Sequence, residues 1–211
     1  MSNFGRKIFI TGIDTNIGKT IVSAIFVEAF AASYWKPIQC GDLEQSDSTM
    51  VKKLCPNAQI HPEQFRFVNP LSPHAAAARE NSPISLSAFQ LPLTAQHMIV
   101  EGAGGPLAPL NASDYIIDIA AKYSLPTIVV TKHYLGSLNH SFLAIEALKR
   151  RNIPILGLVF NGEPHEEYRK FICDKTELPC LLEVKQEASW SHEKISAYAQ
   201  SLREKNHELF T

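Results

Sequence analysis

The feature that most constrains this fold is a series of short apolar, β-branched runs separated by longer segments with helical spacing. The four clearest runs are KIFIT (7–11), HMIVE (97–101), TIVVT (127–131) and ILGLVF (155–160). Runs that are apolar throughout are typical of strands buried on both faces of a parallel sheet. Between them, residues 19–33 and 139–151 repeat apolar side chains at helical intervals. Strands that alternate with helices predict an α/β fold, a three-layer sandwich with a mostly parallel central sheet.

Weaker segments extend this pattern. YWKPIQ (34–39) predicts another strand with Pro37 near its end, CLLEV (180–184) predicts a late strand, and residues 189–210 predict a polar amphipathic helix. The 211 residues, 45% of them hydrophobic, fit one domain, 1–211, with a substantial core. Two domains are the less favoured alternative, because no linker is visible.

Charge and hydropathy argue against two classes of partner. The formal net charge is -1 and no basic run with interleaved aromatics occurs, so we expect no nucleic-acid partner. No apolar stretch approaches the roughly 18 residues that span a bilayer, and MSNFGRKIFI has no signal-type apolar core. We therefore expect no membrane partner and a cytoplasmic location. The four cysteines form no Cys-x-x-Cys pair and are expected to be reduced thiols.

The segment TGIDTNIGKT (11–20) joins the first apolar run to the first helical segment. Its Gly-Lys-Thr ending is typical of a loop that holds nucleotide phosphates, in which Lys19 would reach the outer phosphates and the Thr20 hydroxyl would hold Mg²⁺. Five residues separate Gly12 from Gly18, one more than the Walker A pattern allows. A simple helix cap is the alternative for the tripeptide alone. The strand before it and the helix after it favour a nucleotide-binding phosphate loop.

The lengthened loop resembles that of the dethiobiotin synthetase family. The pattern Gly-x-Asp-Thr-x-x-Gly-Lys-Thr is filled here by Gly12, Asp14, Thr15, Gly18, Lys19 and Thr20. Switch ATPases of the partitioning and nitrogenase type carry a lysine where this chain has Asp14, which argues against them. Further segments that resemble the family follow in order: 34–41, 45–51, 72–77, 100–105 (VEGAGG), 135–140 (LGSLNH), 159–163 and 165–170. The resemblance extends from about residue 7 to 170.

The resemblance implies an ATP- and Mg²⁺-dependent ligase of the P-loop NTPase type. Such an enzyme closes the ureido ring of dethiobiotin from 7,8-diaminopelargonate and CO₂, through a carbamate and its phosphorylated anhydride. This route needs positioning and positive charge, but no protein nucleophile. A non-catalytic ATP-binding paralogue or regulator is an alternative. An amide-forming ligase of corrin biosynthesis is another, although no glutaminase centre is visible.

The resemblance also implies roles for individual residues. Lys19 and Lys36 are the expected catalytic residues, and Thr20, Asp47 and Glu101 the expected Mg²⁺ ligands. The expected nucleotide contacts are Asn16, Ile17, Gly18, Lys19, Thr20, Ile21, Asp47, Glu101, Gly102, Ala103, Gly104, Asn161 and Gly162. The expected substrate contacts are Thr15, Cys40, Ser137, Leu138, Asn139 and Tyr168. Tyr168 is expected to reach the substrate from the partner subunit of a homodimer.

Ordinary structural roles compete with several of these assignments. Asp47 would serve as a helix N-cap, and Lys36 would lie on the surface with its stem over an aromatic ring. Ser137 or Asn139 would cap the following helix. His74 and His140 are expected to form structural hydrogen bonds.

Three positions depart from the family pattern. Gly162 stands where the family carries Asp, Cys40 stands where it commonly carries Ser, and VKQEAS stands in place of a proline-rich nucleotide segment. A thiol is a weaker hydrogen-bond partner than a hydroxyl, and Gly162 offers no side chain. We therefore expect loose recognition of the base. We treat Cys40 as a neighbour of the substrate and not as a nucleophile.

Overall fold

The computed structural model describes residues 5–209 and centres on one seven-stranded sheet. Its strands, in spatial order, are β4 (Ile60–His61), β2 (Ser33–Trp35), β6 (Met98–Glu101), β1 (Lys7–Gly12), β7 (Thr127–Thr131), β8 (Ile155–Asn161) and β9 (Cys180–Val184). Every pair of neighbours in this sheet is parallel. The four strong strand predictions and the late strand are therefore confirmed.

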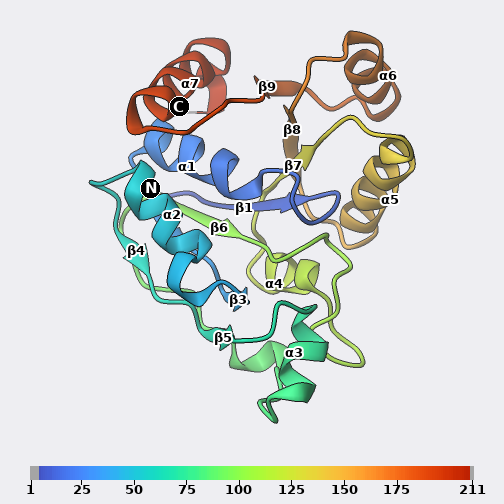
Figure 1. Cartoon of the computed structure of the whole chain (residues 1–211). Helices are drawn as coiled ribbons and strands as arrows, with labels where there is room; N and C mark the ends of the chain where they lie inside the picture. The colour runs from blue at the N-terminus through green and yellow to red at the C-terminus, as the bar shows by residue number, and fades with distance from the viewer. Residues whose placement is uncertain (1–4, 210–211) are drawn as a thin grey trace.

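Helices cover both faces of this sheet. The helices of the described residues are α1 (Lys19–Phe30), α2 (Asp47–Leu54), α3 (Pro73–Arg79), α4 (Ile116–Lys122), α5 (Ser137–Arg150), α6 (Glu166–Thr176) and α7 (His192–Lys205). Of these, α3 packs near β3 (Ile38–Cys40), away from the seven-stranded sheet. Short 3-10 turns occur at η1 (Leu43–Gln45), η2 (Leu86–Ala88) and η3 (His207–Leu209). Figure 1 shows α1 and α7 together on one side of the sheet and α4 and α5 on the other. The predicted three-layer α/β sandwich is confirmed.

The prediction of one strand across residues 34–39 is wrong. The chain leaves the central sheet after Trp35, and β3 (Ile38–Cys40) instead pairs with β5 (Phe65–Phe67) in a separate two-stranded sheet. Pro37 lies at the break, where it has no N–H to donate to a strand ladder. The break places Lys36 between the two sheets instead of within a strand.

Three helix boundaries differ from those predicted. Helix α1 ends at Phe30, because Ala31 adopts the left-handed conformation with φ 47°. Helix α5 begins two residues earlier than predicted, at Ser137. The C-terminal helix is confirmed but shorter than predicted: Ser191 caps it, α7 covers His192–Lys205, and position 210 lies outside the described residues.

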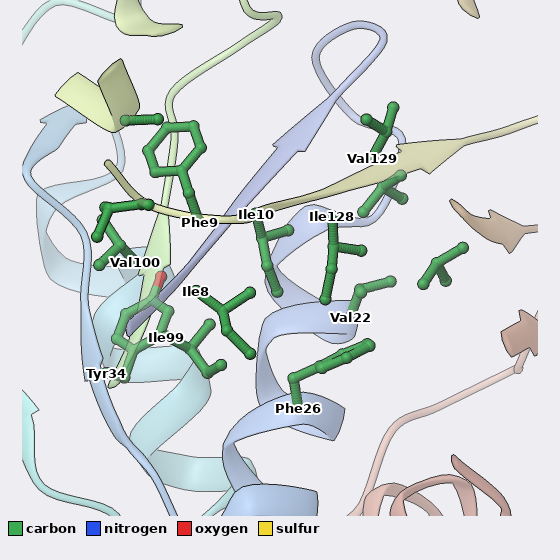
Figure 2. Packing of buried hydrophobic residues seen from close by; sticks show 14 of the residues in the cluster. Ile8, Phe9, Ile10, Val22, Phe26, Tyr34, Ile99, Val100, Ile128 and Val129 are labelled. Carbon is green, nitrogen blue, oxygen red and sulfur yellow. The ribbon is translucent and has the colours of Figure 1, made fainter. Parts of the chain in front are cut away.

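The core fills the space between the sheet and its helices. Figure 2 shows Ile8 and Ile10 of β1 on the side of Val22 and Phe26 of α1, whereas Phe9 points the other way. Successive side chains of a strand point to opposite faces, so a strand buried on both sides must be apolar throughout. This is why the first run contains no polar alternation.

The parallel arrangement brings several chain segments to one edge of the sheet. The carboxyl ends of β1, β6 and β2 meet there, next to the first residues of α1. Ligands of open α/β sheets bind at such an edge. Among residues 5–209, no helix is long and apolar enough to cross a membrane.

Candidate active site

A cleft of about 980 Å³ opens at this edge of the sheet. Its walls are residues 13–16 and 18–21, the segment after β2, the first turn of α2, the segment before α3, the turn after β6, and the first two turns of α5. Polar groups gather at the phosphate-loop end, whereas Ile38, Met50, Leu71, Leu107 and Leu143 line other parts of the cleft. The cleft therefore offers both charged and apolar surface to a ligand.

The phosphate loop is held by side chains and backbone carbonyls around it. Lys19 Nζ donates to the carbonyl oxygen of Asp14 at 2.8 Å, and Asn161 Nδ2 donates to that of Ile17 at 2.8 Å. Gly18 has φ 90°, and a Cβ there would lie 2.1 Å from Asn161 Nδ2. Only glycine satisfies both the backbone conformation and this close approach.

Two carboxylates, a hydroxyl and an ammonium converge beside this loop. The Thr20 hydroxyl lies 2.8 Å from Asp47 Oδ1 and 3.0 Å from Glu101 Oε1. Lys36 Nζ lies 3.0 Å from Glu101 Oε1 and forms a second ion pair with Asp47 Oδ2. Glu101 is fully buried and Lys36 nearly so, so these charges compensate one another away from bulk water.

A tyrosine that the sequence analysis did not select completes the cluster. Tyr34 is fully buried, and its hydroxyl donates to Glu101 Oε2 at 2.9 Å. Burial, followed by the charge of Glu101, raises the pKa of Tyr34 well above 10.0, so the phenol keeps its proton. The signal for it was its place two residues before Lys36, since alternate residues of an extended segment share one face.

The two lysines of the cleft differ in their protonation. Burial lowers the pKa of Lys19 from 10.5 to about 8, an effect that the charge of Glu101 opposes and that of Lys36 reinforces. Burial also acts to lower the pKa of Lys36, but the charges of Glu101 and Asp47 outweigh it and hold the pKa above its usual value. Lys36 is therefore a fixed cation, whereas Lys19 gains or loses its proton close to neutral pH.

The oxygen atoms of this cluster suit a hard divalent cation. Mg²⁺ is commonly held by one or two carboxylates together with phosphate oxygens and water. The Thr20 hydroxyl lies within hydrogen-bond distance of both the Asp47 and the Glu101 carboxylates, so oxygens of all three side chains are close enough to share one cation. No group of three or more His, Cys, Asp or Glu side chains suited to a metal occurs in the described part of the chain. The cluster thus fits a cation that also takes ligands from a nucleotide.

Comparison with known proteins assigns the chain to a family. A family model described as an AAA domain matches residues 6–194. The protein named ATP-dependent dethiobiotin synthetase from Cytophaga hutchinsonii is 44% identical over 200 residues, which cover 93% of this chain and 97% of that protein. The protein of the same name from Chlamydia pneumoniae is 42% identical, over 94% of this chain and 90% of that protein.

The chain belongs to the ATP-dependent dethiobiotin synthetase family. The resemblance inferred from the phosphate loop is thus confirmed at the level of the family. Solved structures agree on the fold: a putative plasmid partition protein from Borrelia burgdorferi, bound to AMPPNP, matches with a TM-score of 0.62 and 11% identity over 98% of this chain and 99% of that chain. A ParA family ATPase from Chlorobium tepidum matches with a TM-score of 0.53 and 14% identity over 96% of this chain and 92% of that chain.

Most of the nucleotide contacts expected from this family lie around the cleft. The cleft is lined by Asn16, Gly18, Lys19, Thr20, Ile21, Asp47, Glu101, Ala103 and Gly104. Ile17 is buried and Gly102 lies against the rings and side chains of the core, so neither is part of the lining. Asn161 and Gly162 line a second, smaller pocket, which adjoins the loop through the contact of Asn161 with Gly18.

The structure rules out two of the ordinary roles considered for family residues. Ser46, not Asp47, caps α2, since its side chain accepts a hydrogen bond from the backbone of Thr49. The Asp47 carboxylate is directed to Lys36 and Thr20 instead. Lys36 is 5% exposed and paired with carboxylates, so it does not lie on the surface over an aromatic ring.

The expected substrate contacts divide into two groups. Thr15 and Cys40 line the cleft. Ser137, Leu138 and Asn139 do not; α5 reaches the cleft through His140, Leu143 and Ala144. Neither Ser137 nor Asn139 caps α5, because Gly136 is the N-cap residue without a side-chain bond. The Ser137 hydroxyl is engaged within the turn, where it donates to the carbonyl of Tyr134 at 2.6 Å.

Tyr168 is buried and forms hydrogen bonds within its own chain. Tyr168 is 5% exposed, and its hydroxyl lies 2.7 Å from Thr131 Oγ1 and 3.1 Å from Ser141 Oγ in the same chain. These contacts hold the hydroxyl within its own chain. The expectation that Tyr168 reaches a substrate bound by the partner subunit stays a prediction.

The remaining expectations concern single side chains. His140 Nδ1 lies 2.8 Å from the Tyr134 hydroxyl and His74 Nδ1 lies 3.1 Å from Ser72 Oγ, as structural roles predict. All four cysteines are free thiols. Burial raises the pKa of Cys40 to about 11, although the charge of Lys36 opposes it, so the thiol stays protonated. A protonated thiol fits a neighbour of the substrate better than a nucleophile.

Proposed function

We propose that this chain, as a single domain over residues 1–211, catalyses the ATP-dependent formation of dethiobiotin from 7,8-diaminopelargonate and CO₂. The observation that carries the proposal is the charged cluster of Lys36, Glu101, Asp47 and Thr20 beside the phosphate loop. Relatives more than 40% identical over most of the chain are named ATP-dependent dethiobiotin synthetase. A cluster of this kind serves phosphoryl transfer, in which catalysis consists of positioning and charge stabilisation.

The two lysines have separate roles in this proposal. Lys19 contacts the outer phosphates of ATP, whose negative charge favours its ammonium form despite the low pKa of the free side chain. Lys36 keeps its charge throughout and stabilises the carbamate and the transferred phosphoryl group. Lys36 is thus a cation with or without ATP, whereas the ammonium form of Lys19 is favoured by the bound phosphates.

Mg²⁺ belongs to the proposal as a companion of ATP. Thr20, Asp47 and Glu101 would hold it, because their oxygens form the cluster at the loop. When bound, the ion would neutralise phosphate charge and align the phosphates. Asp47 can act as a ligand because its carboxylate is ionised. Burial acts to raise the pKa of Asp47, but the charge of Lys36 outweighs the effect of burial and lowers this pKa.

The rest of the cleft is assigned to the substrate. Its apolar lining suits an aliphatic chain, with Thr15 and Cys40 at the end where the diamine reacts. We keep Ser137, Leu138 and Asn139 as the proposed site for the terminal carboxylate, because the first-turn N–H groups of a helix attract carboxylates. The adjoining residues of α5 line the cleft, beginning with His140 at the end of the first turn.

Recognition of the base is proposed at the second pocket. Asn161 is the proposed base contact, and its side chain also holds the phosphate loop through Ile17. Gly162 contributes backbone only, so we propose that base selection is weak. A cytoplasmic homodimer completes the proposal, with Tyr168 as the residue that one subunit offers to the substrate of its partner. Light scattering on the purified protein tests the dimer.

The decisive experiment is detection of the product by mass spectrometry. Purified protein is incubated with 7,8-diaminopelargonate, bicarbonate and MgATP, and dethiobiotin and ADP are measured together. We expect both products in equal amounts, and neither when the diamine is omitted. Binding of ATP without any dethiobiotin would reject the proposal in favour of a non-catalytic ATP-binding regulator.

A further inference from the structure

The buried hydroxyl of Tyr34 has a place in the site that the strand register explains. Tyr34 of β2 lies opposite Ile99 of β6 in the parallel pair, and Glu101 follows two residues later on the same face. Figure 2 shows the Tyr34 ring beside Ile99. The offset of two residues is spanned by the length of the phenol, whose hydroxyl reaches Glu101 Oε2 at 2.9 Å.

The two oxygens of Glu101 have different partners. Oε1 faces Thr20 and Lys36, each at 3.0 Å, at the phosphate-loop end of the cleft. Within residues 5–209, Tyr34 is the one hydrogen-bond donor to Oε2. Both residues are fully buried, so water does not replace the phenol when it is removed. The phenol therefore restrains the rotation of the Glu101 carboxylate while its other oxygen faces Thr20 and Lys36.

We propose that Tyr34 is a positioning residue for the divalent cation, acting through Glu101. This inference rests on the proposed Mg²⁺ and ATP site. Partners that orient a metal-binding side chain change metal affinity although they do not touch the ion. Removal of the hydroxyl frees Glu101 to rotate, or leaves Oε2 buried without a donor, and both outcomes weaken its contribution to the cation site.

The test compares Tyr34→Phe with Tyr123→Phe. Tyr123 is a matched control, because its hydroxyl donates to the carbonyl of Phe89, away from the cleft lining. Mn²⁺ is the probe, and its binding to the protein with a non-hydrolysable ATP analogue is followed by electron paramagnetic resonance. We expect Tyr34→Phe to weaken Mn²⁺ binding about 10- to 100-fold and Tyr123→Phe to leave it unchanged. Binding of the analogue in EDTA should be equal in both variants.

Two further variants separate positioning from a loss of stability. In a Glu101→Gln background, adding Tyr34→Phe should cause no further loss of Mn²⁺ affinity, because the hydroxyl acts through that carboxylate. Additive losses would overturn the inference. Incorporation of 4-aminophenylalanine at position 34 keeps a donor in place and should restore Mn²⁺ affinity, which decides the question even if the Phe variant does not fold. Weak Mn²⁺ binding by this folded variant rejects the role of Tyr34.

Experiments on the wild-type protein distinguish failure of the proposed cation site from failure of the role of Tyr34. If it binds the ATP analogue with no dependence on Mn²⁺, the proposed cation site itself is rejected. If wild-type binding depends on Mn²⁺ and Tyr34→Phe matches the wild type, only the role of Tyr34 is rejected.

Discussion

Replacement of Lys36 by methionine tests the central feature of the site. Methionine keeps most of the aliphatic stem but removes the charge that lies 3.0 Å from Glu101. Because Glu101 is fully buried, it cannot exchange this partner for bulk water. Asp47 loses the same partner, but its side chain is 30% exposed and recovers part of its hydration. The effect on stability should therefore come mainly from Glu101.

The size of this effect follows from the geometry. Two unit charges 3.0 Å apart attract by about 5 kcal/mol at an effective dielectric constant of about 20. Removal of one partner of a buried pair typically costs about 3–5 kcal/mol. For a chain of this size, that loss lowers the melting temperature of the ligand-free protein by about 6–20 °C. Turnover should fall by about 10²–10³, as on removal of one group that stabilises transition-state charge.

Calorimetry and a coupled ADP-release assay measure these effects. Lys194→Met is the control, because Lys194 forms a partly exposed pair with Glu187 and its loss should cost less than about 1 kcal/mol. ATP binding by Lys36→Met, measured by isothermal titration, should change far less than turnover. Turnover equal to that of the wild type would refute the role of Lys36. An equal loss of ATP affinity and turnover would assign Lys36 to ground-state binding instead.

Three further predictions address the loop, the cation site and the thiol. Gly18→Ala should abolish ATP binding in a titration, because the new Cβ would lie 2.1 Å from the side-chain amide nitrogen of Asn161. Gly136→Ala is the control: no atom lies within 4 Å of its Cβ, so the variant should bind ATP and cost only about 1–2 kcal/mol of backbone strain. Asp47→Asn should raise the Mg²⁺ concentration for half-maximal turnover by about tenfold or more. The neighbouring Ser46→Ala removes the cap of α2 and should lower stability by about 1 kcal/mol, but it should leave this Mg²⁺ concentration unchanged. The alkylation rate of Cys40 should rise about tenfold for each unit of increasing pH below a pKa of about 11, because the reactive thiolate is scarce at neutral pH. A pH-independent rate would contradict this.

The sheet could be predicted because its strands carry their own signal. Runs such as 127–131 consist of β-branched residues with an apolar centre, so their composition indicates burial on both faces. The strand predicted across Pro37 failed for a different reason. Its composition suits a strand on either side of the proline, and the two halves belong to two separate sheets. Which sheet a short segment joins depends on partners that its own residues do not specify.

In the site, too, residues of one continuous motif could be predicted from the sequence, whereas contacts between distant segments could not. Lys19 and Thr20 are found from the loop pattern, because a phosphate loop is a continuous segment. Lys36, Asp47 and Glu101 were connected only by family resemblance, and their contacts span up to 81 positions of the chain. Within one chain the hydroxyl of Tyr168 contacts Thr131, and its expected role at a subunit interface stays a prediction.

The sequence by itself determined the layered α/β architecture, the phosphate loop and the family. Each of these rests on the periodicity, capping or motif spacing of short segments, which local residues encode. Only the tertiary structure decided that Tyr34 orients toward Glu101, that Lys36 is enclosed by two carboxylates, and that Tyr168 is turned inward. Such contacts depend on strand register and side-chain direction between distant segments, and packing of the whole chain sets both.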